Sequence, residues 1–311
     1  MLLHQSSGRW RLGLALSVLT VFLWGVLPIA LKVVLEVVDV YTVTWFRFLM
    51  SFWLLAIYLG VKGELGAARR KVGRSRWDFL AIATVFLAAN YVLFLKGLQD
   101  TSPTNSQVII QLAPVVMGMG GLWIFKERYT AQQWLGLMGM MFGMGLFFHE
   151  QLGLLVNAST QYLTGSFYIV LAAVVWAVYA LVQKQLLQQL PSTIIMLIIY
   201  GGSVLLFTPF AHPAVLQTLT PLQWGMLIFC GFNTFLAYGA FAEALDHWEA
   251  SKISAILSTT PIVTLTSVSA VSILIPTLIR PEPMTLMGVV GAIFVVVGSI
   301  GIALGRQRES K

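Results

Sequence analysis

Ten apolar segments, each long enough to form a helix across a lipid bilayer, follow one another along this chain of 311 residues. A membrane-spanning helix needs roughly 20 predominantly apolar residues. Short runs that contain Pro, Gly, charged or capping residues separate the segments, and no long polar region is present. We therefore expect an all-α integral membrane protein with ten transmembrane helices. The segments cover residues 12–34, 40–61, 77–99, 103–125, 131–148, 164–187, 192–210, 223–246, 251–275 and 285–304.

The composition excludes an ordinary soluble domain. Hydrophobic residues make up 58% of the chain and charged residues 10%, whereas soluble domains are nearer half apolar and a quarter charged. The net charge of +7 does not indicate nucleic-acid binding, because the basic residues cluster in short loops rather than in a patch. The partners that we expect are membrane lipid and a small-molecule substrate, with no nucleic acid. Cys230 is the only cysteine, which excludes an intrachain disulfide.

The basic residues predict the orientation in the membrane. If the N-terminus is cytoplasmic, 15 of the 19 Lys and Arg residues fall on the cytoplasmic side and 3 on the other, while Arg47 lies inside the second segment. Positive residues favour the cytoplasmic side, so we expect both termini in the cytoplasm of a bacterial inner (plasma) membrane. The first apolar run has no A-x-A-like cleavage site and is expected to remain as the first helix rather than to be removed as a signal peptide.

The two halves of the chain resemble each other. Residues 90–114 align without a gap on residues 237–261, a shift of 147 that matches Tyr91 with Tyr238 and Pro114 with Pro261. Two further echoes occur at a shift of 152, "WGVLPIALK" (24–32) on "WAVYALVQK" (176–184) and "GLMGMMF" (136–142) on "GVVGAIF" (288–294). Each half then carries five helices, and we predict two repeats, 8–148 and 164–305. Because five is odd, the second repeat is inverted, an arrangement typical of secondary transporters with a substrate site between the halves.

Several motifs together resemble a known family. They are Trp24-Gly25 with Pro28, "WFRF" (45–48), "TSPTNSQVIIQLAPV" (101–115) and "KERYTAQQWLG" (126–136). The whole chain is similar to the EamA-type exporters of the drug/metabolite transporter superfamily. The resemblance implies export of small metabolites or drugs by alternating access, through a central cavity lined by helices 1, 3, 4, 6, 8 and 9. The segment "IRPEPMT" (279–285) departs from the family pattern, because Glu282 stands closer to the following glycine than Glu127 does.

Polar residues at membrane depth are the candidate substrate contacts, because a polar group in hydrocarbon is costly unless it is paired or faces water. Gln107, Gln111 and Pro114 share one face of the fourth segment, and the repeat places Ser254, Ser258 and Pro261 at the matching positions. Each proline removes one backbone donor and frees a carbonyl one turn earlier. Hydrogen bonds between packed helices are the alternative explanation for these residues. Ser251 is expected to cap the ninth helix.

Aromatic residues at matched positions of the repeat complete the predicted site, because aromatic rings can wall an amphipathic ligand. Packing in the core is the alternative for each of them. The predicted substrate-binding residues are Trp24, Asn90, Tyr91, Gln107, Gln111, Trp176, Tyr179, Tyr238 and Ser258.

Lys96 and Glu243 occupy equivalent positions in the two repeats and should lie near opposite faces of the membrane. We predict that they act in gating, together with Pro114 and Pro261. The alternative is that each charged side chain only reaches toward the membrane interface. Arg47 either binds an acidic ligand or braces the bundle. We favour bracing, because the family resemblance leaves the second helix outside the cavity.

Several kinds of chemistry are not indicated. The chain has no G-x4-GK[ST] phosphate loop, no G-x-S-x-G motif, and its four histidines lack metal-ligand spacing. We expect no cofactor, no metal and no enzymatic activity. The function hypothesis is a secondary transporter that exports a small amphipathic metabolite, such as an amino acid. A channel-like facilitator or a drug efflux protein of the same fold is the alternative. Gly139-x3-Gly143 and Gly301-x3-Gly305 indicate close helix packing, in a monomer or a weak homodimer.

Overall fold

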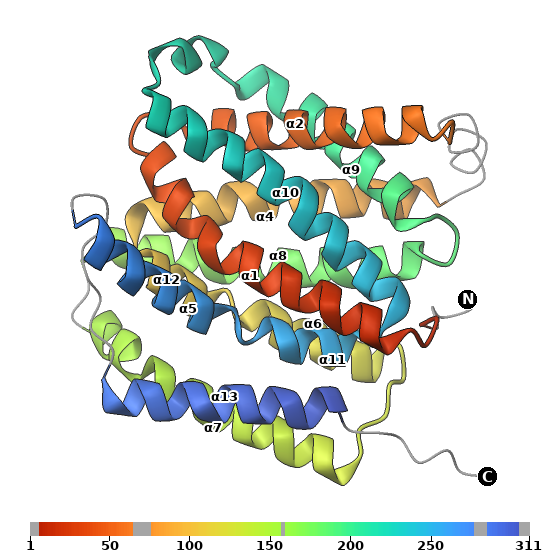
Figure 1. Cartoon of the computed structure of the whole chain (residues 1–311), viewed down its shortest axis with the longest axis vertical. Coiled ribbons are helices and arrows are strands. Elements are labelled where there is room, and N and C mark those ends of the chain that lie inside the picture. The colour runs from red at the N-terminus through yellow and green to blue at the C-terminus, as the bar shows by residue number, and fades with distance from the viewer. Residues whose placement is uncertain (1–5, 65–75, 157–158, 277–284, 305–311) are drawn as a thin grey trace.

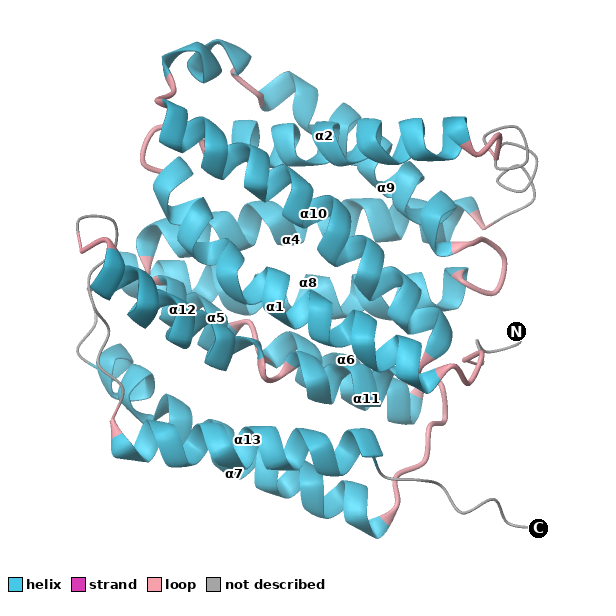
Figure 2. Cartoon of the chain, viewed as in Figure 1, coloured by secondary structure: helices cyan, strands magenta, loops and turns pink. Residues whose placement is uncertain are grey.

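The computed structural model describes residues 6–64, 76–156, 159–276 and 285–304, and within these ranges every regular element is a helix (Figure 2). Nine helical stretches in the described part are long and apolar enough to cross a membrane. The helix α7 occupies the remaining predicted segment. The all-α membrane fold is therefore confirmed. The segment 279–284 and Gly305, on which earlier expectations depend, lie outside the described residues.

The helices follow the predicted segments in order. They are α1 (Trp10–Val34), α2 (Val40–Val61), α4 (Trp77–Asp100), α5 (Pro103–Ile109), α6 (Leu112–Trp123), α7 (Ala131–Val156), α8 (Thr160–Leu186), α9 (Ser192–Phe207), α10 (Pro221–His247), α11 (Ala250–Leu257), α12 (Thr260–Leu274) and α13 (Leu286–Leu304). Two short 3-10 helices, η1 (Thr208–Phe210) and η2 (Pro213–Thr218), connect α9 to α10.

Local capping explains where several helices begin. Asp39 accepts hydrogen bonds from the backbone N–H groups of Tyr41 and Thr42 at the start of α2. Ser102 caps α5, with Pro103 in its first turn, as the sequence predicts. Thr220 caps α10 in a reciprocal capping box with Gln223. Each cap satisfies backbone donors that a membrane helix would otherwise leave without partners at its N-terminus.

The halves of the chain pack against each other in symmetric pairs. The helix α1 packs on α10 and α8 packs on α4, which are equivalent pairs under the predicted repeat. The pairs α2 with α9, α6 with α11, and α7 with α13 each join one helix from either half. In Figure 1, α1 begins and α13 ends on the same side of the bundle, whereas α8 begins on the opposite side. This arrangement is the one that an inverted five-helix repeat generates.

Two transmembrane segments are broken, contrary to the continuous helices expected over 103–125 and 251–275. The first divides into α5 and α6 at Ile110 and Gln111, and the second into α11 and α12 at Ser258 and Thr259. The cause is the proline that follows each break, which cannot donate to the carbonyl four residues earlier.

The carbonyls that the two prolines free find other donors. Ile110 O accepts from the N–H of Ala113 at 2.9 Å, and Leu257 O accepts from the hydroxyl of Thr260 at 2.6 Å. The two broken segments lie beside each other, α6 against α11 and α5 against α12 (Figure 1). Irregular backbone at membrane depth is tolerated where protein buries it or a cavity adjoins it. The breaks therefore mark the centre of the bundle as the place to look for a site.

The pair of α7 and α13 lies at one edge of the bundle and is held by close backbone contact (Figure 1). A Cβ atom on Gly143 would lie 2.7 Å from the carbonyl oxygen of Gly291, and one on Gly136 would lie 2.8 Å from that of Gly298. Gly139, by contrast, has open space around it. Small residues at such contacts let membrane helices approach closely, so this pair stabilises the fold away from the central helices.

Candidate functional site

A cavity of about 90 Å³ lies at the two helix breaks. One enclosed water molecule needs roughly 10–15 Å³ on the same scale, so the cavity has room for several waters or a few groups of a small molecule. Its wall combines residues from both halves of the chain. They are Trp24, Leu27, Arg47, Asn90, Tyr91, Phe94, Leu95, Gln107, Ile110, Gln111, Ala113, Pro114, Trp176, Tyr238, Leu257 and Thr260.

The structure brings most of the predicted substrate-binding residues to this wall. Seven of the nine line the cavity, namely Trp24, Asn90, Tyr91, Gln107, Gln111, Trp176 and Tyr238. Tyr179 and Ser258 do not. The hydroxyl of Ser258 bonds the carbonyl of Ser254 one turn earlier. Tyr179 and Ser258 lie off the wall because packing sets how each helix is rotated about its axis.

Three amide side chains are among the uncharged polar groups of the wall. Asn90 donates from Nδ2 to Ala172 O at 2.9 Å, which ties α4 to α8. Gln107 donates to Trp24 O at 3.4 Å, and Gln111 donates to Gln107 O at 3.1 Å. The Oε1 atom of Gln111 and the Nε1 atom of Trp24 are buried without a hydrogen-bond partner in the described protein. Buried polar atoms are normally bonded, so these two atoms can bond a ligand.

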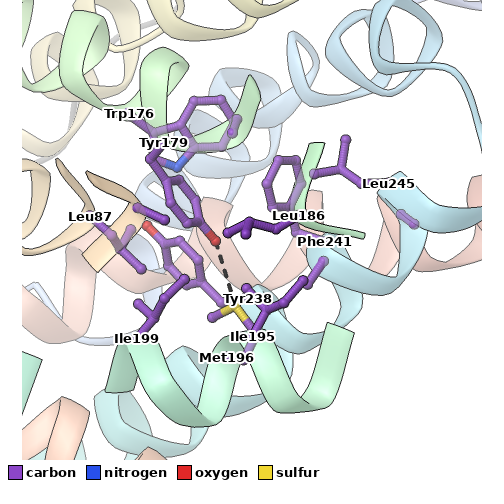
Figure 3. Packing of buried hydrophobic residues seen from close by; sticks show 14 of the residues in the cluster. Leu87, Trp176, Tyr179, Leu186, Ile195, Met196, Ile199, Tyr238, Phe241 and Leu245 are labelled. Atoms are coloured by element: carbon purple, nitrogen blue, oxygen red, sulfur yellow. Dashed lines mark hydrogen bonds between the residues drawn. The ribbon is translucent and has the colours of Figure 1, made fainter. Parts of the chain in front are cut away.

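Four aromatic rings form a continuous surface on the wall. Trp24 lies 5.0 Å from Tyr238 and 5.6 Å from Trp176, and Tyr91 lies 5.5 Å from Tyr238, all measured between ring centroids. Tyr179 lies behind this surface, 6.3 Å from Trp176 and 6.1 Å from Tyr238. Its hydroxyl points toward Met196 and donates to the sulfur of that residue at 3.6 Å (Figure 3). Tyr179 thus supports two wall residues through packing.

The predicted gating residues lie at different places. Lys96 lies near the end of α4, with its ammonium 5.5 Å from the ring of Tyr41 and 5.9 Å from that of Tyr168. Glu243 lies near the end of α10, where it accepts a hydrogen bond from Ser192 and contacts His247 at 3.2 Å. Pro114 lines the cavity. Pro261 is buried beside the second break, outside the wall.

Arg47 is a wall residue that the sequence interpretation placed elsewhere. Its side chain is 2% exposed and lines the cavity, so α2 joins the six helices that the family resemblance implies. The Nε atom donates to the hydroxyl of Thr234 at 2.9 Å, and the guanidinium lies 4.4 Å from the centre of the Tyr91 ring. These contacts agree with a bracing role, while the position at the cavity leaves the side chain within reach of a ligand. A lone arginine within an apolar helix is the signal that favours a functional role.

A buried ion pair joins three helices near the ends of α6 and α8. The carboxylate of Glu127 lies 2.8 Å from the ammonium of Lys184, and the two side chains are 8% and 2% exposed. Glu127 also accepts hydrogen bonds from the N–H groups of Ala250, at 2.9 Å, and Ser251, at 3.0 Å. The start of α11 is therefore capped by a carboxylate from another helix end, and not by the hydroxyl of Ser251 as expected. A negative charge at a helix N-terminus is stabilising.

The surroundings of Glu127 fix its charge. Burial acts to raise the pKa of this carboxyl group, but the nearby Lys184 ammonium and the hydrogen bonds from Ser251 outweigh it and hold the pKa below the ordinary value of 4.5. Glu127 is therefore ionised at neutral pH, and the contact between α6, α8 and α11 is an ionic one.

The comparison with known families decides the class. The model of the EamA-like transporter family matches residues 11–148 and again residues 163–304. This chain belongs to the EamA-like transporter family. The family resemblance drawn from the motifs is thereby confirmed, and the chain is a membrane transporter.

Relatives of this EamA-like transporter agree with that assignment. The uncharacterized inner membrane transporter YhbE of Escherichia coli K12 is 38% identical over 297 residues, which cover 95% of this chain and 92% of YhbE. An uncharacterized transporter of Haemophilus influenzae is 33% identical over 95% of this chain and 96% of its own length. A solved structure with a TM-score of 0.69 and 14% identity, covering 95% of this chain and 99% of that one, shares the fold. The chain is a multi-pass protein of the inner membrane.

The buried pair of Glu127 and Lys184 in this EamA-like transporter leads to a prediction about the stability of the protein. The substitution Glu127→Gln leaves the Lys184 ammonium buried without its carboxylate, and we expect it to lower the free energy of unfolding by roughly 3–5 kcal/mol. Unfolding in mixed detergent micelles measures this. Because the pKa of Glu127 is lowered, the difference from wild type is complete above pH 4.5 and disappears as the pH falls through that lowered pKa.

The matched control is Glu249→Gln, which removes a neighbouring and more exposed pair with Lys252. It should cost less than about 1 kcal/mol. Equal losses for the two variants at neutral pH would contradict a structural role for the Glu127 network.

Proposed function

We propose that this protein is a secondary transporter that exports a small amphipathic metabolite, such as an amino acid or a related compound, by alternating access. The observation that carries the proposal is the cavity at the two helix breaks, which both halves of the chain line. Transporters built from inverted repeats bind substrate near the midplane, next to discontinuous helices, and the repeats rock around that site. The paired helices that join the two halves form interfaces along which one half can move against the other.

Contacts at both ends of the bundle support alternating access over an open channel. At one end, Glu127 ties the end of α6 to Lys184 and to the start of α11. At the other end, the Lys32 ammonium donates to three backbone carbonyls where α4 meets α5, those of Leu98, Gln99 and Thr101, at 3.0, 3.2 and 3.1 Å. A transporter needs a closure on each side of its site. The contacts of Glu127 join the two halves and can be exchanged as the halves move, whereas those of Lys32 join helices within the first half.

The chemistry of the wall supports an amphipathic substrate. Trp24, Tyr91, Trp176 and Tyr238 offer an apolar surface, and the amide groups of Gln107 and Gln111 offer hydrogen bonds. A channel-like facilitator and a drug efflux protein of the same fold are the competing functions. The cavity volume of about 90 Å³ favours a small compound over a bulky drug, and the contacts of Glu127 between the two halves favour alternating access over a channel.

Export requires that the protein have one orientation in the membrane. We propose that both ends of the chain face the cytoplasm. The start of α1 and the end of α13 lie on one side of the bundle (Figure 1), and the excess of Lys and Arg falls on that same side. We expect a green fluorescent protein fused after α13 to fluoresce and an alkaline phosphatase fused there to be inactive. Active phosphatase at that position would reverse the orientation.

Counterflow in proteoliposomes tests the transport mechanism. A screen of amino acids and toxic analogues, in cells with and without the protein, first identifies an exported compound. We expect unlabelled compound inside the vesicles to accelerate uptake of the labelled compound. An alternating-access site that carries unlabelled compound outward becomes available at the outer face to bind labelled compound. A channel would show no such acceleration, and the absence of any exported compound would count against an exporter.

The cavity wall is tested by removing its polar groups. We expect Gln111→Ala and Asn90→Ala each to raise the KM for the exported compound about fivefold to tenfold, the effect of one lost hydrogen bond. Gln133→Ala is the matched control, because Gln133 is also buried but bonds Ile302 O between α7 and α13. If the two wall variants leave transport unchanged while Gln133→Ala lowers only stability, the substrate binds elsewhere.

A further inference from the structure

Arg47 carries a positive charge that the protein does not neutralise. Among the described residues, no Asp or Glu forms an ion pair with it. Its one hydrogen bond there goes from Nε to Thr234, which leaves the donors of both terminal nitrogens without a partner in the described protein. The side chain is 98% buried, given its exposed fraction of 2%, and borders the cavity. A charge held in this way is costly unless a partner arrives.

The groups around Arg47 orient its side chain without cancelling its charge. The hydroxyl of Thr234 donates to Cys230 O, so its oxygen is free to accept from Arg47 and from the Tyr91 hydroxyl. The Tyr91 ring lies under the guanidinium at 4.4 Å and stabilises the cation. These contacts hold the planar guanidinium in one place. A guanidinium held this way is suited to bind a carboxylate through two parallel hydrogen bonds.

The rest of the wall agrees with an anionic ligand. Among the described residues that line the wall there is no Asp or Glu, so these residues give the cavity a net charge of +1 through Arg47. A single carboxylate would neutralise it, whereas a cationic ligand would be repelled and a phosphate dianion would leave a charge uncompensated. The unbonded Nε1–H of Trp24 and the unbonded Oε1 of Gln111 can serve a carboxylate oxygen and a ligand N–H or O–H group, respectively.

We propose that the transported metabolite is a small organic carboxylate with an apolar body, and that Arg47 binds its carboxylate in the central cavity. The aromatic surface of Trp24, Trp176 and Tyr238 holds the apolar body. The identification of the ligand as the transported metabolite rests on the proposed transport function, whereas the binding of a carboxylate at Arg47 does not. The proposal excludes amines and other purely cationic compounds as substrates.

Binding of charge-matched probes to the purified protein in lipid nanodiscs tests the assignment. Isocaproate, leucine, leucinamide and isoamylamine share one branched carbon skeleton and differ in charge. Intrinsic tryptophan fluorescence reports binding, because Trp24 and Trp176 lie in the wall. We expect isocaproate and leucine to bind at least about tenfold more tightly than the other two probes, the effect of a charge-assisted hydrogen bond. Equal or tighter binding of the amines, or no binding of either carboxylate, would overturn the proposal.

Variants of Arg47 show whether this residue is the cause. In Arg47→Gln, we expect the affinity for isocaproate to fall at least about tenfold and the affinity for isoamylamine to stay the same or rise. Misfolding would not raise the affinity for isoamylamine. Arg47→Lys keeps the charge but loses the planar fork, so its affinity for isocaproate should be intermediate. Lys62→Gln, which removes an exposed cation at the end of the same helix, should leave both affinities unchanged.

The binding assay tests the carboxylate site and the counterflow assay tests the transport function, so either can be contradicted without the other. If isocaproate binds in an Arg47-dependent manner but no carboxylate is exchanged across vesicles, the site stands and the transport function fails. If compounds without a carboxylate are exchanged and Arg47→Gln leaves their transport intact, the transport function stands and the carboxylate site is wrong. An unchanged affinity of Arg47→Gln for isocaproate would also overturn the assignment.

Discussion

The requirement that every backbone polar group find a partner without the help of water governs this structure. It is why the described chain is entirely helical, since a helix satisfies its own backbone within the bilayer. Pro114 and Pro261 break that rule at matching positions, and the freed carbonyls of Ile110 and Leu257 are satisfied locally. The two breaks adjoin each other, and the cavity lies there. The inverted repeat thus places the two interrupted helices side by side. The cavity between them is where a small polar ligand can be held inside the membrane.

Buried cations are the second constraint, and the protein treats them in different ways. Lys184 is neutralised by Glu127, and the half-buried Lys32 donates hydrogen bonds to three backbone carbonyls, both near helix ends. Arg47 receives only a hydroxyl and an aromatic ring. The two lysines can serve as structural contacts between helices because their partners belong to the protein. The partner of Arg47 has to come from outside, and its position at the cavity is what makes an external partner physically possible.

The sequence was sufficient for the ten segments, and seven of its nine predicted substrate-binding residues lie on the wall, because hydrophobic length and repeat matching depend on the order of residues alone. The breaks at Gln111 and Ser258 were missed, since the spacing of polar residues was counted on an unbroken helix. The position of Arg47 depends on how α2 rotates against α4 and α10, which no single segment encodes. The cap of α11 was assigned to Ser251, whereas the capping carboxylate of Glu127 lies far away in the chain. The errors at Arg47 and at the cap of α11 concern interactions between segments, whereas the breaks have a local cause in the proline that follows each of them.

One family model matches both halves of the chain, but the halves differ in the side chains that face the cavity. The first half supplies the charge of Arg47 and all three amides, whereas the second half supplies Trp176, Tyr238, Leu257 and Thr260. In the proposed alternating-access cycle, two related halves let either side of the bundle open by the same movement. Unlike walls would hold the proposed carboxylate in one orientation, with its charged end toward the first half and its apolar body toward the aromatic rings of both. In this proposal, the likeness of the halves serves the movement, and the difference in their side chains serves recognition of the ligand.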